Sequence, residues 1–205
     1  TLGNASDASG GLASNYQLPT LNNANAPVTI TAATLTTTLT NTGVTKTYDG
    51  TTNAPSSFIP TWSYSGFVSG DTAATLAYTG VGYDHAGVSS ATKVTVSGIT
   101  LASITGSNSS ALSDYSVAAS KDISATITKA TLTVTANDNA KFVTQANPSF
   151  TVSYSGFVNG ETSSVLTTGA SVSRGGSATV AGSYANDLVA SGASSSNYSL
   201  VYVNG

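Results

Sequence analysis

Residues 62–72 read WSYSGFVSGDT and residues 152–162 read VSYSGFVNGET, so eight of eleven positions recur 90 residues later. A second pair of stretches, ITAATL at 30–35 and ITKATL at 127–132, recurs at a spacing of 97 residues. Self-similarity at a nearly constant spacing is the signature of repeated modules. The repeats therefore divide the chain into 1–33, the tail of a preceding module; 34–130, a complete module; and 131–205, a shorter module.

The shorter module stops where another strand of the ITxATL type is due, so its sheet is expected to lack a final strand. We hypothesise that residues 1–33 stand in for missing partners, either within the chain or by strand exchange between copies. The junction around Lys129–Thr131 has no Gly/Ser spacer. The sequence therefore predicts a stiff connection between the two modules.

Alternation of apolar residues with Thr or Ser is the main signal for secondary structure. It occurs at 28–30, 94–96, 123–127, 132–134 and 150–154, and more loosely at 200–203. Side chains of a strand point alternately to opposite faces, so each stretch predicts one buried face and one face covered by hydroxyls. With frequent turn residues, this indicates an all-β fold of tandem, small, sandwich-like modules in an elongated rod. Each module is immunoglobulin-like or, alternatively, β-grasp-like.

Composition excludes several classes of function. The 205 residues include 33 Ser and 33 Thr but only 7% charged residues, and the net charge is −3. Six Lys and Arg cannot form a basic face for phosphates, so no nucleic acid is expected as a partner. No cysteine and a single histidine rule out zinc, haem and iron–sulfur sites. No apolar run approaches the length of a membrane span, so no membrane insertion is expected.

Several motifs of the complete module resemble the YDG repeat of bacterial surface proteins. They are KTYDGTT at 46–52, YSGF at 64–67, GDT at 70–72, DYSV at 114–117 and ITKATL at 127–132. The shorter module is similar to the related MBG repeat through Lys141-Phe142, Asn147-Pro148, 154–162 and 196–200. The MBG pattern usually has Tyr-Gly after its lysine, whereas this chain has Phe142-Val143. Such repeats occur in tandem in large exported adhesins, including filamentous-haemagglutinin-like exoproteins of two-partner secretion.

The motif residues are interpreted first as structural. Tyr48-Asp49-Gly50 fits a turn in which Asp accepts backbone hydrogen bonds and Gly adopts positive φ. The repeated aromatic residues at 64, 67, 154 and 157 are expected to anchor cores. Asp71 and Glu161 occupy equivalent turns, and we interpret them as exposed acids, the alternative being a cap for calcium between modules. Neither a metal site nor a cofactor site is assigned.

Catalysis has no motif to support it, so we expect the chain not to be an enzyme. His85 is the only imidazole, and it directly follows Asp84. If the chain binds glycan, Trp62 and Tyr64 are the candidate stacking platform. Candidate glycosylation sites of the N-x-S/T type begin at Asn4, Asn108 and Asn197.

Together, resemblance and composition predict the stalk of an exported bacterial adhesin. The stalk would lie at the cell surface or outside the cell, project a binding region, and support adhesion to cells, matrix or host, including biofilm formation. Its partners would be neighbouring modules of the same long chain, with polysaccharide or other adhesin copies as further candidates. Two alternatives stay open: a module that itself recognises glycan or another copy, and a filament subunit that exchanges strands.

Overall fold

The computed structural model describes residues 30–177 and 179–205. The strands of the described residues all belong to one compact unit, Ala33–Gly205. Strand makes up 43% of the structure and helix 3%, in several small sheets, which confirms the all-β prediction. The strand expected at 28–30 falls mostly outside the described residues. Among those described, no helix is long and apolar enough to cross a bilayer.

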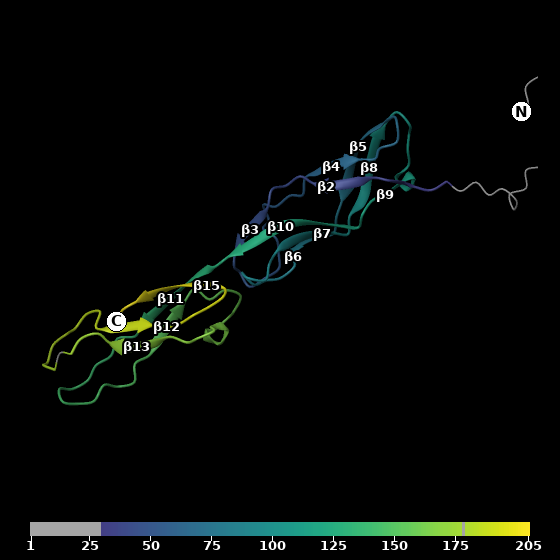
Figure 1. Ribbon diagram of the computed structural model, residues 1–205. Helices are drawn as coiled ribbons and strands as arrows, with labels where there is room; N and C mark the ends of the chain where they lie inside the picture. Colours follow the sequence, from purple (N-terminus) through teal and green to yellow (C-terminus); the bar gives the residue numbers. More distant parts are fainter. Residues whose placement is uncertain (1–29, 178) are drawn as a thin grey trace, which may run out of the picture. The chain divides into compact units, whose positions relative to one another are not determined.

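We call β1 to β10 the first module and β11 to β15 the second module (Figure 1). The first module contains β1 (Ala33–Thr34), β2 (Thr36–Leu39), β3 (Val44–Thr47), β4 (Trp62–Ser65), β5 (Asp71–Ala77), β6 (Gly80–Tyr83), β7 (Lys93–Ser97), β8 (Thr100–Gly106), the 3-10 turn η2 (Leu112–Asp114), β9 (Tyr115–Ser116) and β10 (Ser120–Thr128). Its largest sheet has the order β3-β10-β7-β6. The other strands of the module form three separate pairs, β1-β9, β2-β4 and β5-β8.

The second module is shorter. It contains β11 (Ala130–Ala136), β12 (Val152–Ser155), the 3-10 turn η3 (Ser163–Val165), β13 (Ser171–Arg174), β14 (Leu188–Ser191) and β15 (Tyr198–Val203). Its strands form a sheet of order β12-β11-β15 and the pair β13-β14. The two modules are joined directly, because β10 ends at Thr128 and β11 begins at Ala130.

The sequence repeat is also a repeat of strand pairing. Ala33 pairs with Tyr115 in the first module, and its counterpart Ala130 pairs with Tyr198 in the second, both in parallel. The antiparallel neighbours also correspond, since β2 pairs with β4 and β11 with β12 through equivalent residues. The glycine of the YSGF motif is required in both copies, because a Cβ there would lie 2.6 Å from a carbonyl oxygen of the neighbouring strand.

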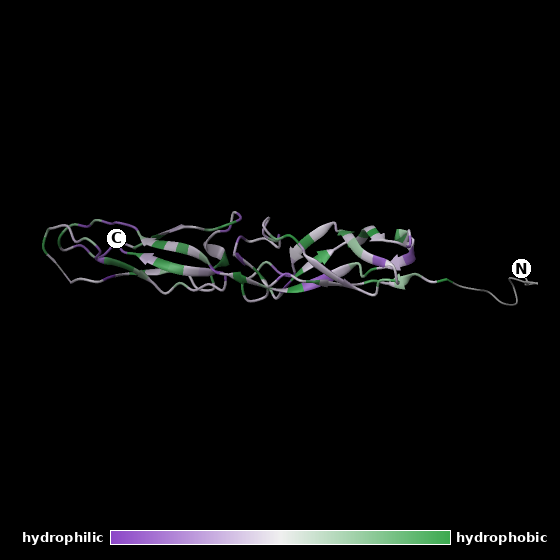
Figure 2. Cartoon of the chain, turned by 90° about the horizontal axis from the view of Figure 1, so that it is seen from above, coloured by the Kyte–Doolittle hydropathy of each residue, from purple (hydrophilic) through white to green (hydrophobic). Residues whose placement is uncertain are grey.

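Alternation of buried and exposed side chains follows the sequence pattern. In β11, Ala130, Leu132, Val134 and Ala136 are buried, whereas the intervening threonines are exposed or half-buried. In β10, Ala125 and Ile127 are buried between exposed hydroxyl residues. Figure 2 shows the resulting alternation of hydrophobic and paler bands along the strands. The abundant threonines thus serve as β-branched residues on the polar faces of thin sheets.

The largest group of buried apolar residues crosses the boundary between the modules. It consists of Val44, Tyr48, Tyr83, Ala91, Val94, Ala125, Ile127, Ala130, Leu132 and Tyr198. A smaller group, made of Val134, Ala136, Leu188 and Ala190, lies within the second module. The boundary between the modules is therefore a packed core.

Candidate functional site at the junction of the modules

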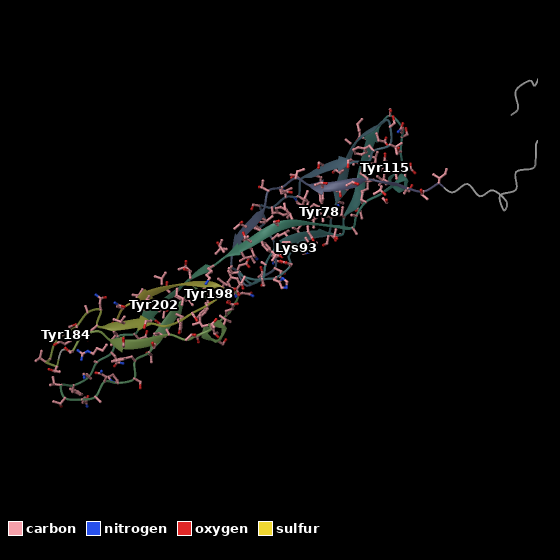
Figure 3. The ribbon with its side chains drawn as sticks, in the orientation of Figure 1. Tyr78, Lys93, Tyr115, Tyr184, Tyr198 and Tyr202 are labelled. Carbon is pink, nitrogen blue, oxygen red and sulfur yellow. The ribbon has the colours of Figure 1, made fainter. Side chains whose placement is uncertain are left out.

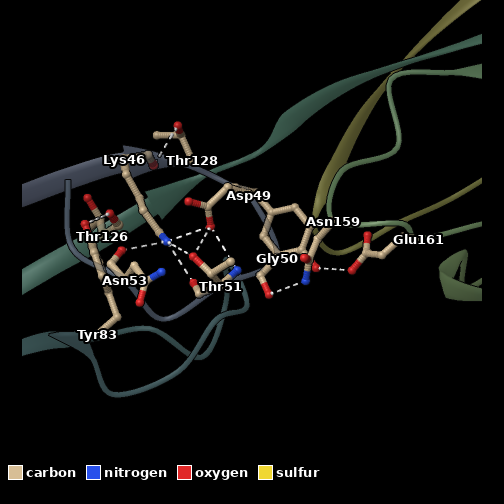
Figure 4. A network of polar contacts seen from close by, with 11 residues as sticks. Lys46, Asp49, Gly50, Thr51, Asn53, Tyr83, Thr126, Thr128, Asn159 and Glu161 are labelled. Carbon is tan, nitrogen blue, oxygen red and sulfur yellow. Dashed lines mark hydrogen bonds and ion pairs between the residues drawn. The ribbon is translucent and has the colours of Figure 1, made fainter. Parts of the chain in front are cut away.

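A compact turn of the first module, residues 46–51, provides one side of the junction (Figure 4). The Lys46 side chain is only 7% exposed, and its Nζ donates to Asp49 Oδ1 at 2.7 Å and to the carbonyls of Thr51 and Asn53 at 2.8 and 2.9 Å. Asp49 Oδ1 also accepts from the backbone N–H and the hydroxyl of Thr51, each at 2.9 Å. The lysine thus closes the loop, and the carboxylate fixes the turn that follows it.

The charges of this turn compensate one another. Burial by itself would raise the pKa of Asp49, but the hydrogen bonds from Lys46 and Thr51 outweigh it, and the pKa lies below its ordinary value. Lys46 Nζ also lies 5.2 Å from the centre of the Tyr83 ring, within range of a cation–π interaction. The turn is therefore held by the Lys46–Asp49 ion pair, by hydrogen bonds to the backbone and by the contact with the Tyr83 ring. The side chain of Tyr48 extends from this turn.

Tyr48 carries the contact to the second module. Its side chain is buried, and its hydroxyl donates to Glu161 Oε1 at 2.6 Å. The Tyr48 and Tyr198 rings meet edge to face, with centres 5.5 Å apart and planes at 82°. Tyr198 donates to the other oxygen of Glu161 at 2.5 Å. Burial, followed by the neighbouring Glu161, raises the pKa of Tyr48 to about 12, and the same causes raise the pKa of Tyr198. Both hydroxyls are therefore protonated donors at ordinary pH.

Two further hydrogen bonds connect the modules, and a third connects the linker residue Lys129 to the second module. Asn159 Nδ2 donates to Gly50 O at 3.2 Å, the Val88 backbone N–H donates to Asn197 Oδ1 at 3.0 Å, and Lys129 Nζ donates to Ser195 O at 2.8 Å. Gly50 has a φ of +74°, and a Cβ on it would lie 2.7 Å from the Asn159 Cβ. Only glycine therefore fits this close approach without displacing the neighbouring module.

The side of the second module that receives Tyr48 has a counterpart in the first module. Each module stacks three aromatic rings in the same order: Tyr64, Phe67 and Tyr115 in the first, and Tyr154, Phe157 and Tyr198 in the second. Tyr115 and Tyr198 are labelled in Figure 3. In both modules, this last tyrosine accepts a backbone N–H and donates to a carboxylate, which is Asp71 in the first and Glu161 in the second.

The interpretation of Asp71 and Glu161 as exposed acids is wrong. Asp71 is only 7% exposed and accepts from the hydroxyls of Ser110 and Tyr115, both at 2.7 Å. Glu161 is half-buried between two tyrosine hydroxyls. In the described part of the chain, no three His, Cys, Asp or Glu side chains gather where they could hold a metal ion. Both acids instead accept hydrogen bonds from the aromatic stacks.

Trp62 and Tyr64, the candidate glycan platform, lie in β4. Both are half-buried on one face of the strand, and the exposed Ser63 and Ser65 lie on the other. Tyr64 stacks on Phe67 at 6.0 Å, so at least part of its ring serves the core. The structure thus brings the two rings to one face but leaves neither fully open.

The three candidate glycosylation sites have different surroundings. Asn4 lies outside the described residues. Asn108 is in an exposed loop, and its side-chain amide donates to Ser69 O. Asn197 is half-buried at the junction, where its Oδ1 accepts from Val88. A glycan on Asn197 would therefore compete with the junction itself.

The Asp84–His85 pair is a local structure of the first module. Asp84 accepts from the Thr92 hydroxyl at 2.6 Å and from the Thr92 backbone N–H at 3.0 Å. These bonds, the one from the hydroxyl foremost, hold the pKa of Asp84 well below its ordinary value. His85 Nδ1 lies 3.5 Å from Asp84 Oδ2, and its side chain is 63% exposed. Asp84 thus ties the end of β6 to the start of β7.

The junction itself was not predicted from the sequence. Tyr48 and Glu161 were each assigned to a turn, but they are far apart in the sequence, and neither motif indicates a partner. The signal lay in a difference between the repeats: Asp71 is replaced by Glu161, which is longer by one methylene. The longer side chain of Glu161 accepts hydrogen bonds from two tyrosines, Tyr48 and Tyr198.

Comparison with known families matches both modules. The YDG domain matches residues 31–125, and the MBG domain of the YGX type matches residues 132–205. Neither a curated protein nor a solved structure matches the chain. The two matches agree with the resemblance carried by the motifs and are consistent with a repeat region of bacterial surface proteins. The chain therefore carries a YDG domain and an MBG domain in tandem.

Proposed function

We propose that this tandem is a stiff structural segment of an exported bacterial adhesin, where it holds a binding region away from the cell surface. The observation that carries the proposal is the junction. A linker of one residue, a buried apolar core and a carboxylate shared by two tyrosines join the modules. A binding module would not need such a joint, whereas a spacer depends on it because each flexible joint shortens the mean reach of a chain.

Low charge supports the same role. Only 7% of residues are charged, and hydroxyl groups cover the polar faces of the strands. Such a surface offers little electrostatic attraction to nucleic acid, anionic lipid or charged solutes. A spacer with this surface would leave recognition to the region it carries. The proposal assigns the chain neither catalysis nor a cofactor.

Rigidity of the junction can be measured directly because the chain has no cysteine. Spin labels on Thr105→Cys in the first module and Ser173→Cys in the second should give a narrow distance distribution by pulsed electron resonance. Tyr48→Ala in the same labelled protein should broaden it. A distribution in the unmodified junction as broad as in the Tyr48→Ala protein would contradict a stiff spacer.

The role in the parent protein needs a separate experiment on whole cells. Deletion of residues 33–205 should leave export and binding of soluble ligand intact but weaken attachment of the cells to a surface. An unrelated stiff spacer of the same length should restore attachment. Loss of soluble-ligand binding on deletion would instead indicate that these domains recognise the ligand themselves.

A further inference from the structure

The second module receives the first module on residues 159–161 and 197–198, which we call the acceptor surface. Three of its polar side chains bind the first module: Glu161 accepts from Tyr48, Asn159 donates to Gly50, and Asn197 accepts from Val88. In the first module, residues 69–71 and 114–115 are the counterpart of this surface. Figure 3 shows that Tyr198 lies beside the junction, whereas Tyr115 lies at the opposite end of the first module.

The counterpart surface is covered by a loop of its own module, residues 107–111. This loop bonds to the same three positions that bind a neighbouring module in the acceptor surface. Ser110 Oγ donates to Asp71 Oδ2 at 2.7 Å, Asn108 Nδ2 donates to Ser69 O, and the Ala111 N–H donates to Asp114 Oδ2 at 2.8 Å. In the first module, the loop therefore takes the place of a neighbouring module.

The loop belongs to an insertion that the second module lacks. β7 and β14 correspond, because each is followed by a glycine at positive φ, +64° at Gly98 and +83° at Gly192. Sixteen residues separate Gly98 from Tyr115, but only five separate Gly192 from Tyr198. The additional residues include β8, which pairs with β5 alone, and the loop that follows it. Figure 1 shows β5 and β8 at the end of the first module that lies away from β11.

Loop 107–111 also fills the space in front of the turn at Gly70. A Cβ on Gly70 would collide with the Asn108 side chain, whereas the space around a Cβ on the equivalent Gly160 is open. Two chain segments cannot occupy the same space. A turn of the kind formed by residues 46–51 therefore cannot reach Gly70 while the loop lies on it.

The carboxylate of Asp71 has an acceptor position that the loop leaves unused. Glu161 uses both of its oxygens, one for Tyr198 of its own module and one for Tyr48 of the other. Asp71 is only 7% exposed, and its Oδ2 accepts both hydroxyls that reach it. Among the described residues, no donor reaches its buried Oδ1. A buried acceptor without a donor is costly, so a further hydroxyl at Oδ1 would be favourable.

We propose that residues 69–71 and 114–115 form a second docking site between modules, which loop 107–111 holds closed. The occupant that fits is a turn of the kind formed by residues 46–51, from another YDG domain, with its tyrosine hydroxyl on Asp71. With the loop in place, such a turn binds the second module but not the first. The loop thus determines which neighbouring modules form a joint, whatever role the segment has in adhesion.

A duplication within the full chain tests the proposal. In this protein, residues 33–129 occur twice in tandem, so that Lys129 of the first copy precedes Ala33 of the second, as it precedes Ala130 in the natural chain. The turn of the first copy then lies one linker residue from the closed site of the second copy. A short tether gives the turn a high effective concentration at that site, so that failure to dock reports the loop and not dilution.

Spin labels at equivalent positions compare the two joints of this protein. Ser124→Cys in the first copy and Ser63→Cys in the second span the added joint. Ser124→Cys in the second copy and Ser153→Cys, the counterpart of Ser63, span the natural joint, and all three serines are exposed. Pulsed electron resonance should give a broad distance distribution across the added joint and a narrow one across the natural joint. An added joint as narrow as the natural one overturns the proposal, whereas a broad natural joint would contradict the proposed stiff spacer instead.

Loosening the loop should open the site. Asn108→Gly, Ser109→Gly and Ser110→Gly in the second copy should narrow the distribution across the added joint to that of the natural joint. The same substitutions in the first copy, which has no added joint at its own site, should leave it broad. The milder pair Asn108→Ser and Ser110→Ala should narrow it less. A distribution that stays broad in both variants, with unchanged Trp62 emission, would mean that residues 69–71 accept no turn and would overturn the proposal.

Discussion

In both modules the repeated tyrosine donates to a carboxylate, but the acidic side chain is longer in the second module than in the first. In the first, the carboxylate of Asp71 accepts from two hydroxyls of its own module, those of Ser110 and Tyr115. In the second, Glu161 accepts from its own Tyr198 and from Tyr48 of the first module. A single methylene thus accompanies the change from a bond that closes one module to a bond that connects two. The comparison suggests that tandem repeats can acquire a joint by small changes at one position.

The strongest test of this difference replaces the two equivalent tyrosines. Tyr198→Ala should destabilise the second module and the junction by about 3–5 kcal/mol, the usual cost of removing a buried aromatic side chain. Tyr115→Ala should cost a similar amount but only in the first module. Trp62 is the sole tryptophan and lies in the first module, so its fluorescence separates the two in urea unfolding. Equal effects of both variants on the Trp62 transition would refute an asymmetric joint.

Two glycines at positive φ sharpen the comparison. Gly160→Ala should cost about 1–2 kcal/mol for the left-handed backbone alone, because the space around its Cβ is open. Gly50→Ala meets the same backbone cost and also forces its Cβ against Asn159, which should add about 1–3 kcal/mol. Circular dichroism of urea unfolding measures both. Equal losses of unfolding free energy in the two variants would contradict a steric clash between a Cβ at Gly50 and Asn159.

Shortening the shared carboxylate should remove one bond and retain the other. Glu161→Asp keeps the charge and should resemble Asp71, with Tyr198 still bound and Tyr48 released. The expected loss is about 1.5–3 kcal/mol, the range for a hydrogen bond to a charged group. Double-mutant cycles with Tyr48→Phe measure the coupling. A coupling energy near zero would show that the Tyr48 hydroxyl does not depend on Glu161.

A second difference between the modules lies in their thin cores. Thr37 in the first module corresponds to Val134 in the second, and both are at most 1% exposed. The Thr37 hydroxyl has no hydrogen-bond partner among the described residues. Thr37→Val should therefore stabilise the first module by about 1 kcal/mol, and Val134→Thr should destabilise the second by about 1–3 kcal/mol. Thermal unfolding of the two variants measures both effects, and a destabilising Thr37→Val would mean that the hydroxyl is satisfied.

The last prediction concerns the loss of stability when Tyr48 loses its proton at alkaline pH. The pKa of Tyr48 is about 12 in the folded protein and 10 when unperturbed, so the folded state holds this proton more tightly. The resulting stability is fully present below pH 10 and is lost as the pH rises from 10 to 12. The difference in unfolding free energy between the natural chain and Tyr48→Phe should shrink over this range. A constant difference up to pH 12 would contradict the raised pKa that burial and Glu161 give Tyr48.

The fold was more accessible from the sequence than the junction. Alternation predicts β7, β10, β11 and β15, because a strand with one polar face has a polar residue at every second position of its sequence. The repeats place equivalent strands, and the pairing of Ala33 and Ala130 with equivalent tyrosines bears this out. The burial of Asp71 was missed, because a turn rich in Gly and Ser is typical of an exposed loop. Its burial depends on β8 and the loop that follows, which no local pattern indicates.

The pairing of β11 with β15 has a mechanical consequence. These strands are parallel neighbours over six residues, from Ala130 opposite Tyr198 to Thr135 opposite Val203. A pull that acts on the chain before Ala130 and after Gly205 drives the two strands past each other along their length. All the hydrogen bonds of the ladder then bear the load together, rather than opening one after another as in a hairpin pulled from its ends. Tension along the chain therefore acts on the second module in its most resistant direction.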